Sequence, residues 1–146
     1  MQHDEQGAKS FQTSIHIQAT PEAVWAILTD APAWPTWNTT VTRIEGTIAH
    51  QQKIAVHAMI SPNRAFKVTV SELVPPQRMV WSDGMPLGLF RARRTFTLTP
   101  KDGGTEFFMR EVFSGLMAPL IVRSIPDLQP SFEEFAACLK RRAERA

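Results

Sequence analysis

Residues 86–115 read PLGLFRARRTFTLTPKDGGTEFFMREVFSG and form the clearest local pattern in the chain. Two stretches in which apolar and polar residues alternate, 89–98 and 106–113, flank the tetrapeptide Lys101-Asp102-Gly103-Gly104. Asp-Gly and Gly-Gly steps supply the positive φ angles that tight hairpin turns require. The pattern therefore predicts a long β-hairpin that turns at residues 101–104.

The turn also predicts the register of this hairpin. If Lys101 faces Gly104, the numbers of opposed residues sum to 205, which places Arg94 opposite Glu111. Three apolar pairs share the face of that charged pair: Ala92 with Phe113, Phe96 with Met109, and Leu98 with Phe107. One face of an antiparallel sheet normally packs on the core. We therefore expect Arg94 and Glu111 to point into the interior, provided that no one-residue bulge shifts the register.

Length and composition describe an ordinary globular chain. The 146 residues are 43% apolar and 21% charged, which predicts one domain with a substantial core. A formal net charge of +2 is too small to indicate nucleic-acid binding. The single cysteine, Cys138, excludes an internal disulfide, and its helical surroundings indicate a buried thiol. No apolar run is long enough for a membrane span and the N-terminus lacks the order of a secretion signal, so we expect a cytoplasmic location.

The N-terminal part of the chain predicts a tail, a strand and two short helices. Residues 1–10 are polar and unpatterned, which predicts a disordered tail before a single domain at 11–146. Alternation then predicts a strand at 11–18. Thr20 and Pro21 form a helix start, with a capping hydroxyl before a proline at the first helical position. The segment 32–38 contains two prolines and two tryptophans, so it must be short and must cover something apolar.

The rest of the chain predicts more strands and then a helix. Alternating runs separated by turn residues predict strands at 40–48, 53–60, 65–74 and 78–82. After Gly115, apolar residues recur every three or four positions, which predicts a helical stripe of about 25 residues, interrupted near Pro126 and Pro130. Ser131 or Asp127 can cap its restart. The fold class is therefore α+β: a seven-stranded curved antiparallel sheet wrapped around a long C-terminal helix, with two short helices after the first strand.

A curled sheet that grips one helix leaves space between the two, and this space widens toward the strand ends. Large apolar side chains that we expect to point into it are candidates for the lining of a ligand cavity. They are Trp37, Phe66, Trp81, Phe90, Phe113, Met117, Ile121, Phe132 and Phe135, with Arg94 and Glu111 as the polar members.

Four segments carry a resemblance to a known family: ATPEAVW at 19–25, WPTWN at 34–38, the 103–105 turn leading to EVFSG at 111–115, and the closing helix at 132–144. Their order and spacing resemble the START-like superfamily, which includes Bet v 1-like proteins and bacterial SRPBCC proteins of the polyketide cyclase/dehydrase type. The resemblance spans residues 11–145 and implies a helix-grip fold around a hydrophobic cavity, with no common cofactor. It does not fix function, because members include carriers, receptors and cyclases. Bacterial relatives often place a histidine where Arg94 stands, and an arginine cannot act as a base.

Three interpretations of the Arg94–Glu111 pair remain open. It can be a buried ion pair with a structural role only, or the polar end of a cavity in which Arg94 donates to a carboxylate or carbonyl of an apolar ligand. It can also contain a catalytic base, Glu111, although no serine, histidine or tyrosine is placed to assist it. The sequence holds no cluster with metal-ligand spacing and no phosphate-binding loop, so we expect neither a metal nor a cofactor.

The function that the sequence predicts is binding or transport of a small hydrophobic ligand, such as a lipid, a polyketide or an isoprenoid-like compound. The first alternative is a polyketide cyclase or aromatase that uses the same cavity. The second is a protein-binding module in which Arg91, Arg93 and Arg110 on the outer sheet face contact an acidic partner. The residues favour a binder over an enzyme.

Overall fold

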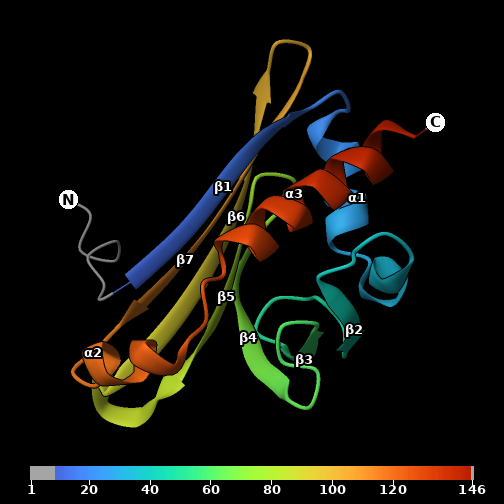
Figure 1. The fold of residues 1–146 in the computed structure, drawn as a ribbon. Helices are drawn as coiled ribbons and strands as arrows, with labels where there is room; N and C mark the ends of the chain where they lie inside the picture. The colour runs from blue at the N-terminus through green and yellow to red at the C-terminus, as the bar shows by residue number, and fades with distance from the viewer. Residues whose placement is uncertain (1–8, 146) are drawn as a thin grey trace.

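One seven-stranded antiparallel sheet organises the protein, with strand order β1-β7-β6-β5-β4-β3-β2 (Figure 1). The structure is a computed structural model and describes residues 9–145. Its elements are β1 (Lys9–Ile17), α1 (Pro21–Leu28), η2 (Ala31–Thr36), β2 (Val41–Glu45), β3 (Lys53–Ala58), β4 (Ala65–Val74), β5 (Arg78–Met85), η3 (Pro86–Gly88), β6 (Phe90–Lys101), β7 (Gly104–Ser114), α2 (Ala118–Ile121), η4 (Val122–Ser124) and α3 (Gln129–Glu144). The predicted fold class is confirmed: the sheet curls around the C-terminal helix.

The β6–β7 hairpin has the register that its turn predicts. Lys101 pairs with Gly104 and Arg94 with Glu111, and no bulge interrupts the ladder back to Arg91. Asp102 and Gly103 take the positive φ angles of 51° and 78° that the turn needs. Register shifts occur elsewhere, between β2 and β3 and between β4 and β5. The strands that carry the charged pair are therefore the longest and most regular in the sheet.

Helix α3 crosses the inner face of the sheet and is fastened along the β1 edge (Figure 1). Three hydrogen bonds join α3 to β1 and to Gln18, the residue that follows it: Gln129 Nε2 to the Gln12 carbonyl (2.8 Å), Lys140 Nζ to the His16 carbonyl (2.7 Å), and the Gln18 amide to Glu144 Oε2 (2.8 Å). The bonds are distributed from the first turn of the helix to its last. They fix the helix lengthwise over one side of the sheet.

The two short helices after β1 form as predicted. Thr20 Oγ1 accepts a hydrogen bond from the Ala23 amide (3.1 Å), and Pro21 occupies the first helical position of α1. In η2, Trp34 is completely buried and its indole Nε1 donates to the Leu28 carbonyl (3.1 Å). The tryptophan-rich segment therefore closes the side of the interior next to α1.

Several predicted boundaries are wrong, among them the ends of β2 and β3, which lie at Glu45 and Ala58 and not at residues 48 and 60. Lys9 and Ser10 belong to β1, where they pair with Phe113 and Val112, so the predicted tail at 1–10 is too long; residues 1–8 lie outside the described residues. Strand β5 continues to Met85, beyond the predicted end at residue 82, because β6 goes on pairing with it through Gly84. The alternation of apolar and polar residues stops at Ser82. Backbone pairing between strands does not require this alternation, so the strand can continue beyond it.

The C-terminal helix is shorter than predicted. The apolar stripe of about 25 residues divides into the short helices α2 and η4 and a separate α3 of 16 residues. Ser131 does not cap α3; Leu128 holds the capping position, and Asp127 Oδ1 accepts a hydrogen bond from the Gln129 amide (3.1 Å). Among the described residues, no helix is long and apolar enough to cross a membrane.

Candidate ligand-binding site

The Arg94–Glu111 ion pair lies on the inner face of the sheet, under α3. Arg94 Nη2 and Nε each lie 2.6 Å from Glu111 Oε1, and the Phe132 ring of α3 faces the guanidinium at 4.9 Å. The Arg94 side chain keeps 21% of its surface exposed and Glu111 keeps 13%. The predicted inward direction is confirmed by this contact with α3, and the pair remains within reach of solvent.

Aromatic residues surround the pair on the sheet and on the helix. Across the sheet, Phe11 of β1 pairs with Glu111, and Trp81 of β5 pairs with Arg94. Phe11 also lies 6.0 Å from Phe132, between ring centroids, which closes the side of the pair toward β1. The Trp81 Nε1 atom is buried and has no hydrogen-bond partner within residues 9–145. The pair therefore has aromatic neighbours both on the sheet and on the helix.

At one end of the interior, six buried aromatic residues pack against one another, and we call them the aromatic core. They are Trp34, Trp37, Trp81, Phe96, Phe107 and Phe135. Phe135 lies at the centre of the group, with ring centroids 5.4 Å from Trp34 and 6.0 Å from Phe107. Their own rings occupy the space between them, so this end has the character of a packed core.

At the other end of the interior, four of the predicted lining residues remain partly exposed. They are Phe66 at the start of β4, Phe90 at the start of β6, Met117 before α2, and Ile121 in α2, and we call this group the open end. Phe90 stacks on the buried Phe113 with centroids 6.0 Å apart. The Arg94–Glu111 pair is two positions along the strands from Ala92 and Phe113, so it lies between the open end and the aromatic core.

The structure thus divides the predicted lining into three groups. Trp37, Trp81 and Phe135 belong to the aromatic core. Phe66, Phe90, Met117 and Ile121 form the open end, and the buried Phe113 and Phe132 lie beside the ion pair. The sequence pattern missed Phe11 and Trp34. Phe11 begins the alternation of β1, and its parity places it on the same face, which was the available signal.

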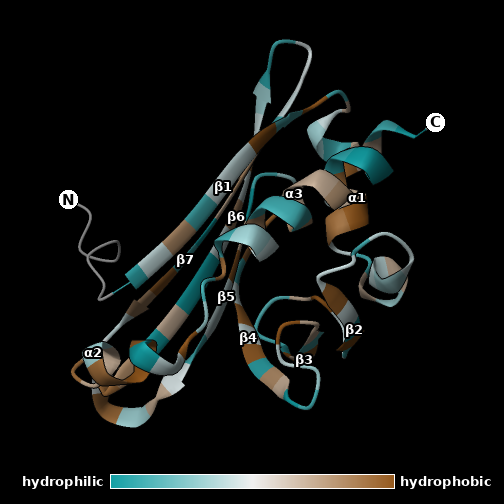
Figure 2. Ribbon diagram, viewed as in Figure 1, coloured by the Kyte–Doolittle hydropathy of each residue, from teal (hydrophilic) through white to brown (hydrophobic). Residues whose placement is uncertain are grey.

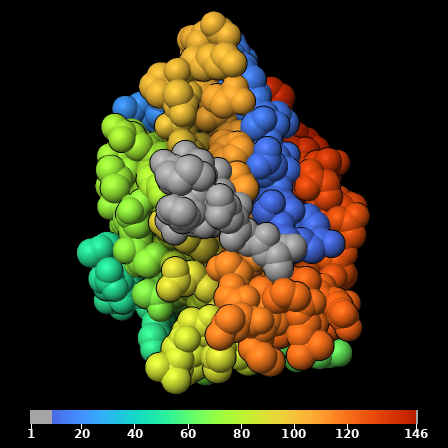
Figure 3. All heavy atoms as spheres, turned by 90° about the vertical axis from the view of Figure 1, so that its left-hand side faces the viewer, coloured from blue at the N-terminus to red at the C-terminus, as the bar shows by residue number. Residues whose placement is uncertain are grey.

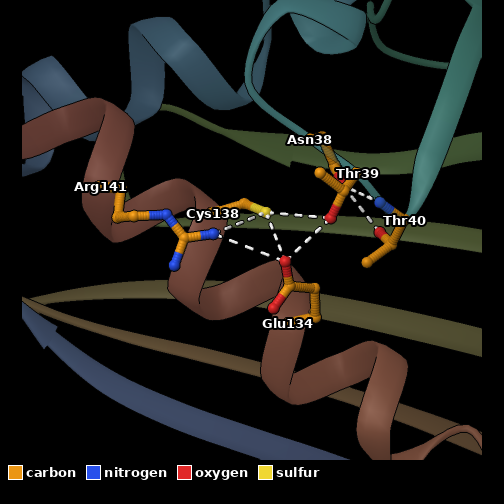
Figure 4. Close-up of polar contacts among 6 residues, drawn as sticks. All are labelled: Asn38, Thr39, Thr40, Glu134, Cys138 and Arg141. Carbon is orange, nitrogen blue, oxygen red and sulfur yellow. Dashed lines mark hydrogen bonds and ion pairs between the residues drawn. The ribbon is translucent and has the colours of Figure 1, made fainter.

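A second polar cluster fastens α3 to the segment that leads into β2 (Figure 4). Glu134 Oε2 accepts hydrogen bonds from Thr39 Oγ1 (2.9 Å), Cys138 Sγ (3.4 Å) and Arg141 Nη2 (3.5 Å). The Thr39 hydrogen bond, helped by those from Cys138 and Arg141, lowers the pKa of Glu134 below its ordinary value. Cys138 is buried as predicted, but its polar surroundings were not foreseen from the sequence.

This cluster borders a surface cleft that is separate from the ion pair. The cleft has a volume of about 540 Å³ and lies at the C-terminal end of α3. Its lining is Thr36, Trp37, Thr39, Cys138, Arg141, Arg142, Glu144 and Arg145. Neither Arg94 nor Glu111 borders it, so the cleft is not the predicted cavity.

Two histidines of the described residues lie on β1 and β3. His16 contacts Gln18, and His57 contacts Glu45 at 3.2 Å on the outer side of β3. Within the described part of the chain, no three His, Cys, Asp or Glu side chains lie close enough together to hold a metal ion.

Comparison with solved structures shows the same fold in several bacterial proteins. A hypothetical protein from Helicobacter pylori superposes with a TM-score of 0.75 at 12% identity, covering 94% of this chain and 89% of the other. A START superfamily protein from Mycobacterium smegmatis gives 0.67 at 15% identity, with 93% and 97% covered. The di-domain ARO/CYC BexL from the BE-7585A biosynthetic pathway gives 0.68 at 16% identity, with 94% of this chain and 50% of BexL covered.

Sequence comparison identifies the family of the chain. A comparison with curated proteins found no match. The model of the family described as "Polyketide cyclase / dehydrase and lipid transport" matches residues 8–144, which is nearly the whole chain. Together with its START-like fold, this match shows that the protein belongs to the polyketide cyclase/dehydrase and lipid transport family.

Proposed function

We propose that this protein binds a small hydrophobic ligand at the open end of the interior, with the acidic or carbonyl group of the ligand held by Arg94. The observation that carries the proposal is the ion pair itself, which keeps partial solvent contact although aromatic rings surround it. The partial exposure keeps the N–H groups of Arg94 that Glu111 does not occupy within reach of a ligand.

The chemistry around the pair favours a ligand that carries hydrogen-bond acceptors. Arg94 has five N–H donors, of which Nε and Nη2 contact one oxygen of Glu111. The remaining N–H groups of Arg94 can donate to a carboxylate, sulfonate or ketone of a ligand.

The apolar part of the ligand would lie against the residues of the open end. Phe90, Met117 and Ile121 are partly exposed and adjoin the ion pair through Phe113. Covering such side chains stabilises a complex by roughly 25 cal/mol for each Å² removed from water. Affinity would therefore come from the rings, and orientation from Arg94.

Two related dyes test this proposal. Anilinonaphthalene sulfonate and N-phenyl-1-naphthylamine share the same rings, and only the first carries an anionic sulfonate. We expect the protein to bind both dyes, and to bind the sulfonate about tenfold more tightly, because a charge-assisted hydrogen bond contributes about 1.5–3 kcal/mol. Fluorescence titration measures both dissociation constants.

The decisive variant is Arg94→Gln/Glu111→Gln, which replaces the ion pair by two neutral amides of similar size. It should bind the two dyes about equally, whereas Arg93→Gln, on the outer face of the same strand, should keep the wild-type preference. Failure of the wild-type protein to bind either dye would reject the proposal, as would a preference for the sulfonate that survives in the double variant.

A cyclase or aromatase activity is the second candidate, since the fold is shared with an ARO/CYC protein. In that case Glu111 would move a proton on a carbonyl-bearing chain bound at the same place. Incubation with a reactive poly-β-ketone mimic separates the two functions: turnover that Glu111→Gln abolishes while dye binding persists favours the enzyme.

A further inference from the structure

Most of the large apolar side chains that the protein exposes are gathered at one place. Leu87 is 94% exposed and Leu116 is 83% exposed, and four further residues in the same two connections are also exposed. The six residues, which we call the apolar tip, are Met85, Leu87, Leu89, Leu116, Met117 and Leu120. Figure 2 shows the hydrophobic colouring of α2 and the adjoining turn at this end of the molecule. Single exposed leucines are ordinary, but a group of this size marks an interaction surface.

Hydrogen bonds hold the two halves of the apolar tip together. The Met117 amide donates to the Leu89 carbonyl (2.7 Å) and the Leu116 amide to the Gly88 carbonyl (3.4 Å). Gly115 permits this approach, because a Cβ atom there would lie 2.8 Å from the Gly88 and Leu89 carbonyl oxygens. Figure 3 shows the two segments side by side along the lower end of the molecule. The leucines are therefore presented by one joined surface, not by two independent loops.

The backbone at Leu87 has a conformation that is unusual for a leucine. Its φ angle is +62°, in the left-handed region that a leucine rarely adopts. The side chain gains no burial in return, since nearly all of it is exposed. A strained residue that contributes nothing to the core suggests a role outside the folded chain.

The two segments that form the apolar tip carry basic residues. Segments 84–92 and 114–125 contain two charged residues, Arg91 and Arg123, and both are exposed. Asp83, which is also exposed, lies two positions before Met85, so the two arginines leave a small net positive charge around the tip. Projecting leucines flanked by arginines are complementary to a layer of anionic headgroups over hydrocarbon.

We propose that the apolar tip docks the protein on the surface of a membrane that contains anionic lipids. A lipid surface needs no matching shape, so it can accept side chains that project singly from turns, whereas a protein partner would need a complementary pocket. The tip includes Met117 and adjoins Phe90, so docking would bring the open end of the interior to the bilayer surface. The proposal does not require that an interior ligand exists.

Sedimentation of the full chain with lipid vesicles tests the docking. Vesicles of phosphatidylcholine alone are compared with vesicles that also contain phosphatidylglycerol. We expect binding to the anionic vesicles that weakens as salt is added. Leu87→Asn/Leu116→Gln should lower the partition coefficient by about a hundredfold, since burying one leucine contributes about tenfold or more. Asparagine tolerates the left-handed φ angle at position 87, so this variant keeps the turn.

Two further variants separate the apolar and the electrostatic parts. Arg91→Gln/Arg123→Gln should weaken binding to the anionic vesicles by about tenfold or more, because each basic residue near such a surface contributes about fivefold. Val74→Gln is the matched control, since Val74 is an exposed apolar residue at the last position of β4 and does not belong to the apolar tip. It should bind like the wild-type protein.

Three results would overturn the proposal. The first is a wild-type chain that does not sediment with anionic vesicles although it is folded by circular dichroism. The second is equal vesicle binding by the wild type and the double leucine variant. The third is a dimer in analytical ultracentrifugation that the leucine variant converts to monomer, which would assign the tip to a second copy of the chain. Dye binding by the same variants distinguishes these failures from a failure of the ligand proposal, because the tip variants leave Arg94 and Glu111 unchanged.

Discussion

The aromatic core and the open end lie under the same helix and on the same face of the same sheet, yet they differ in packing. In the aromatic core, rings contact rings and every member is buried. At the open end, Phe66, Phe90, Met117 and Ile121 remain partly exposed. The difference indicates that the aromatic core stabilises the fold, and the open end is the part at which we propose that a ligand binds. Substitutions that separate the two halves can test this division.

The largest effect is expected from Phe135→Ala. Phe135 contacts four aromatic residues of the core, so its removal leaves a cavity that rigid rings cannot collapse to fill. We expect a loss of about 3–5 kcal/mol in the free energy of unfolding, measured by urea denaturation. Phe90→Ala at the open end is the comparison and should cost about 1–2 kcal/mol, since only part of that ring is buried. Equal losses would show that the two ends are packed alike.

A smaller effect is expected from Arg94→Ala. It leaves the Glu111 carboxylate without its partner among aromatic rings, and solvent contact reduces the penalty of about 3–5 kcal/mol known for fully buried pairs. We expect a loss of about 2 kcal/mol, and less than about 1 kcal/mol for Arg94→Gln/Glu111→Gln, where no charge remains unpaired. Chemical denaturation of both variants measures this. A double variant that is less stable than Arg94→Ala would contradict this expectation and would show that the ion pair itself is a major source of stability.

Thr39→Val tests the attachment of α3 on the β2 side of the sheet. The substitution keeps the size of the side chain and removes the hydroxyl that donates to Glu134 and contacts Cys138. We expect a loss of about 1 kcal/mol. Thr42→Val, which removes a hydroxyl bound to the His57 carbonyl within the sheet, is a matched control that leaves α3 untouched. Hydrogen exchange should show faster opening of α3 in Thr39→Val alone.

The smallest effect is the pH dependence of that attachment. The pKa of Glu134 is lower in the folded state than in the unfolded chain. Its carboxylate therefore contributes stability that is fully present above the unfolded pKa and is lost as the pH falls through the folded pKa. Glu134→Gln should have a lower Tm than the wild type at neutral pH, and the difference should shrink as the solution is acidified. A constant difference across the acid range would contradict this assignment.

The sequence predicted the sheet well because its signals are local. An Asp-Gly-Gly turn and strict alternation determine the register of β6 and β7. Counting residues back from the turn therefore predicts that Arg94 lies opposite Glu111. Strand ends were less accurate, as at Met85, because pairing depends on the neighbouring strand. The prolines predicted a break in the C-terminal helical stripe, but they did not predict the lengths of α2 and α3.

The division of the lining residues could not be predicted. Phe66 belongs to an alternating run and Trp37 to a tryptophan-rich segment, so both are predicted to face the interior. The sequence does not show which of the two is more deeply buried. Burial is decided by where α3 and η2 rest on the sheet, which depends on contacts such as Thr39 with Glu134, 95 positions apart. The role of the predicted lining residues in ligand binding stays a prediction, to be tested with the paired dyes.

The unbroken ladder between β6 and β7 restricts how this hairpin can change during evolution. Each residue from Arg91 to Lys101 has a fixed partner, and adjacent residues face opposite sides of the sheet. Inserting or deleting a single codon between the turn and Arg94 would exchange the two sides, exposing Phe96 and Leu98 while burying threonines. Divergence here should therefore proceed by point substitution, and related hairpins should keep a constant number of residues between this position and the turn.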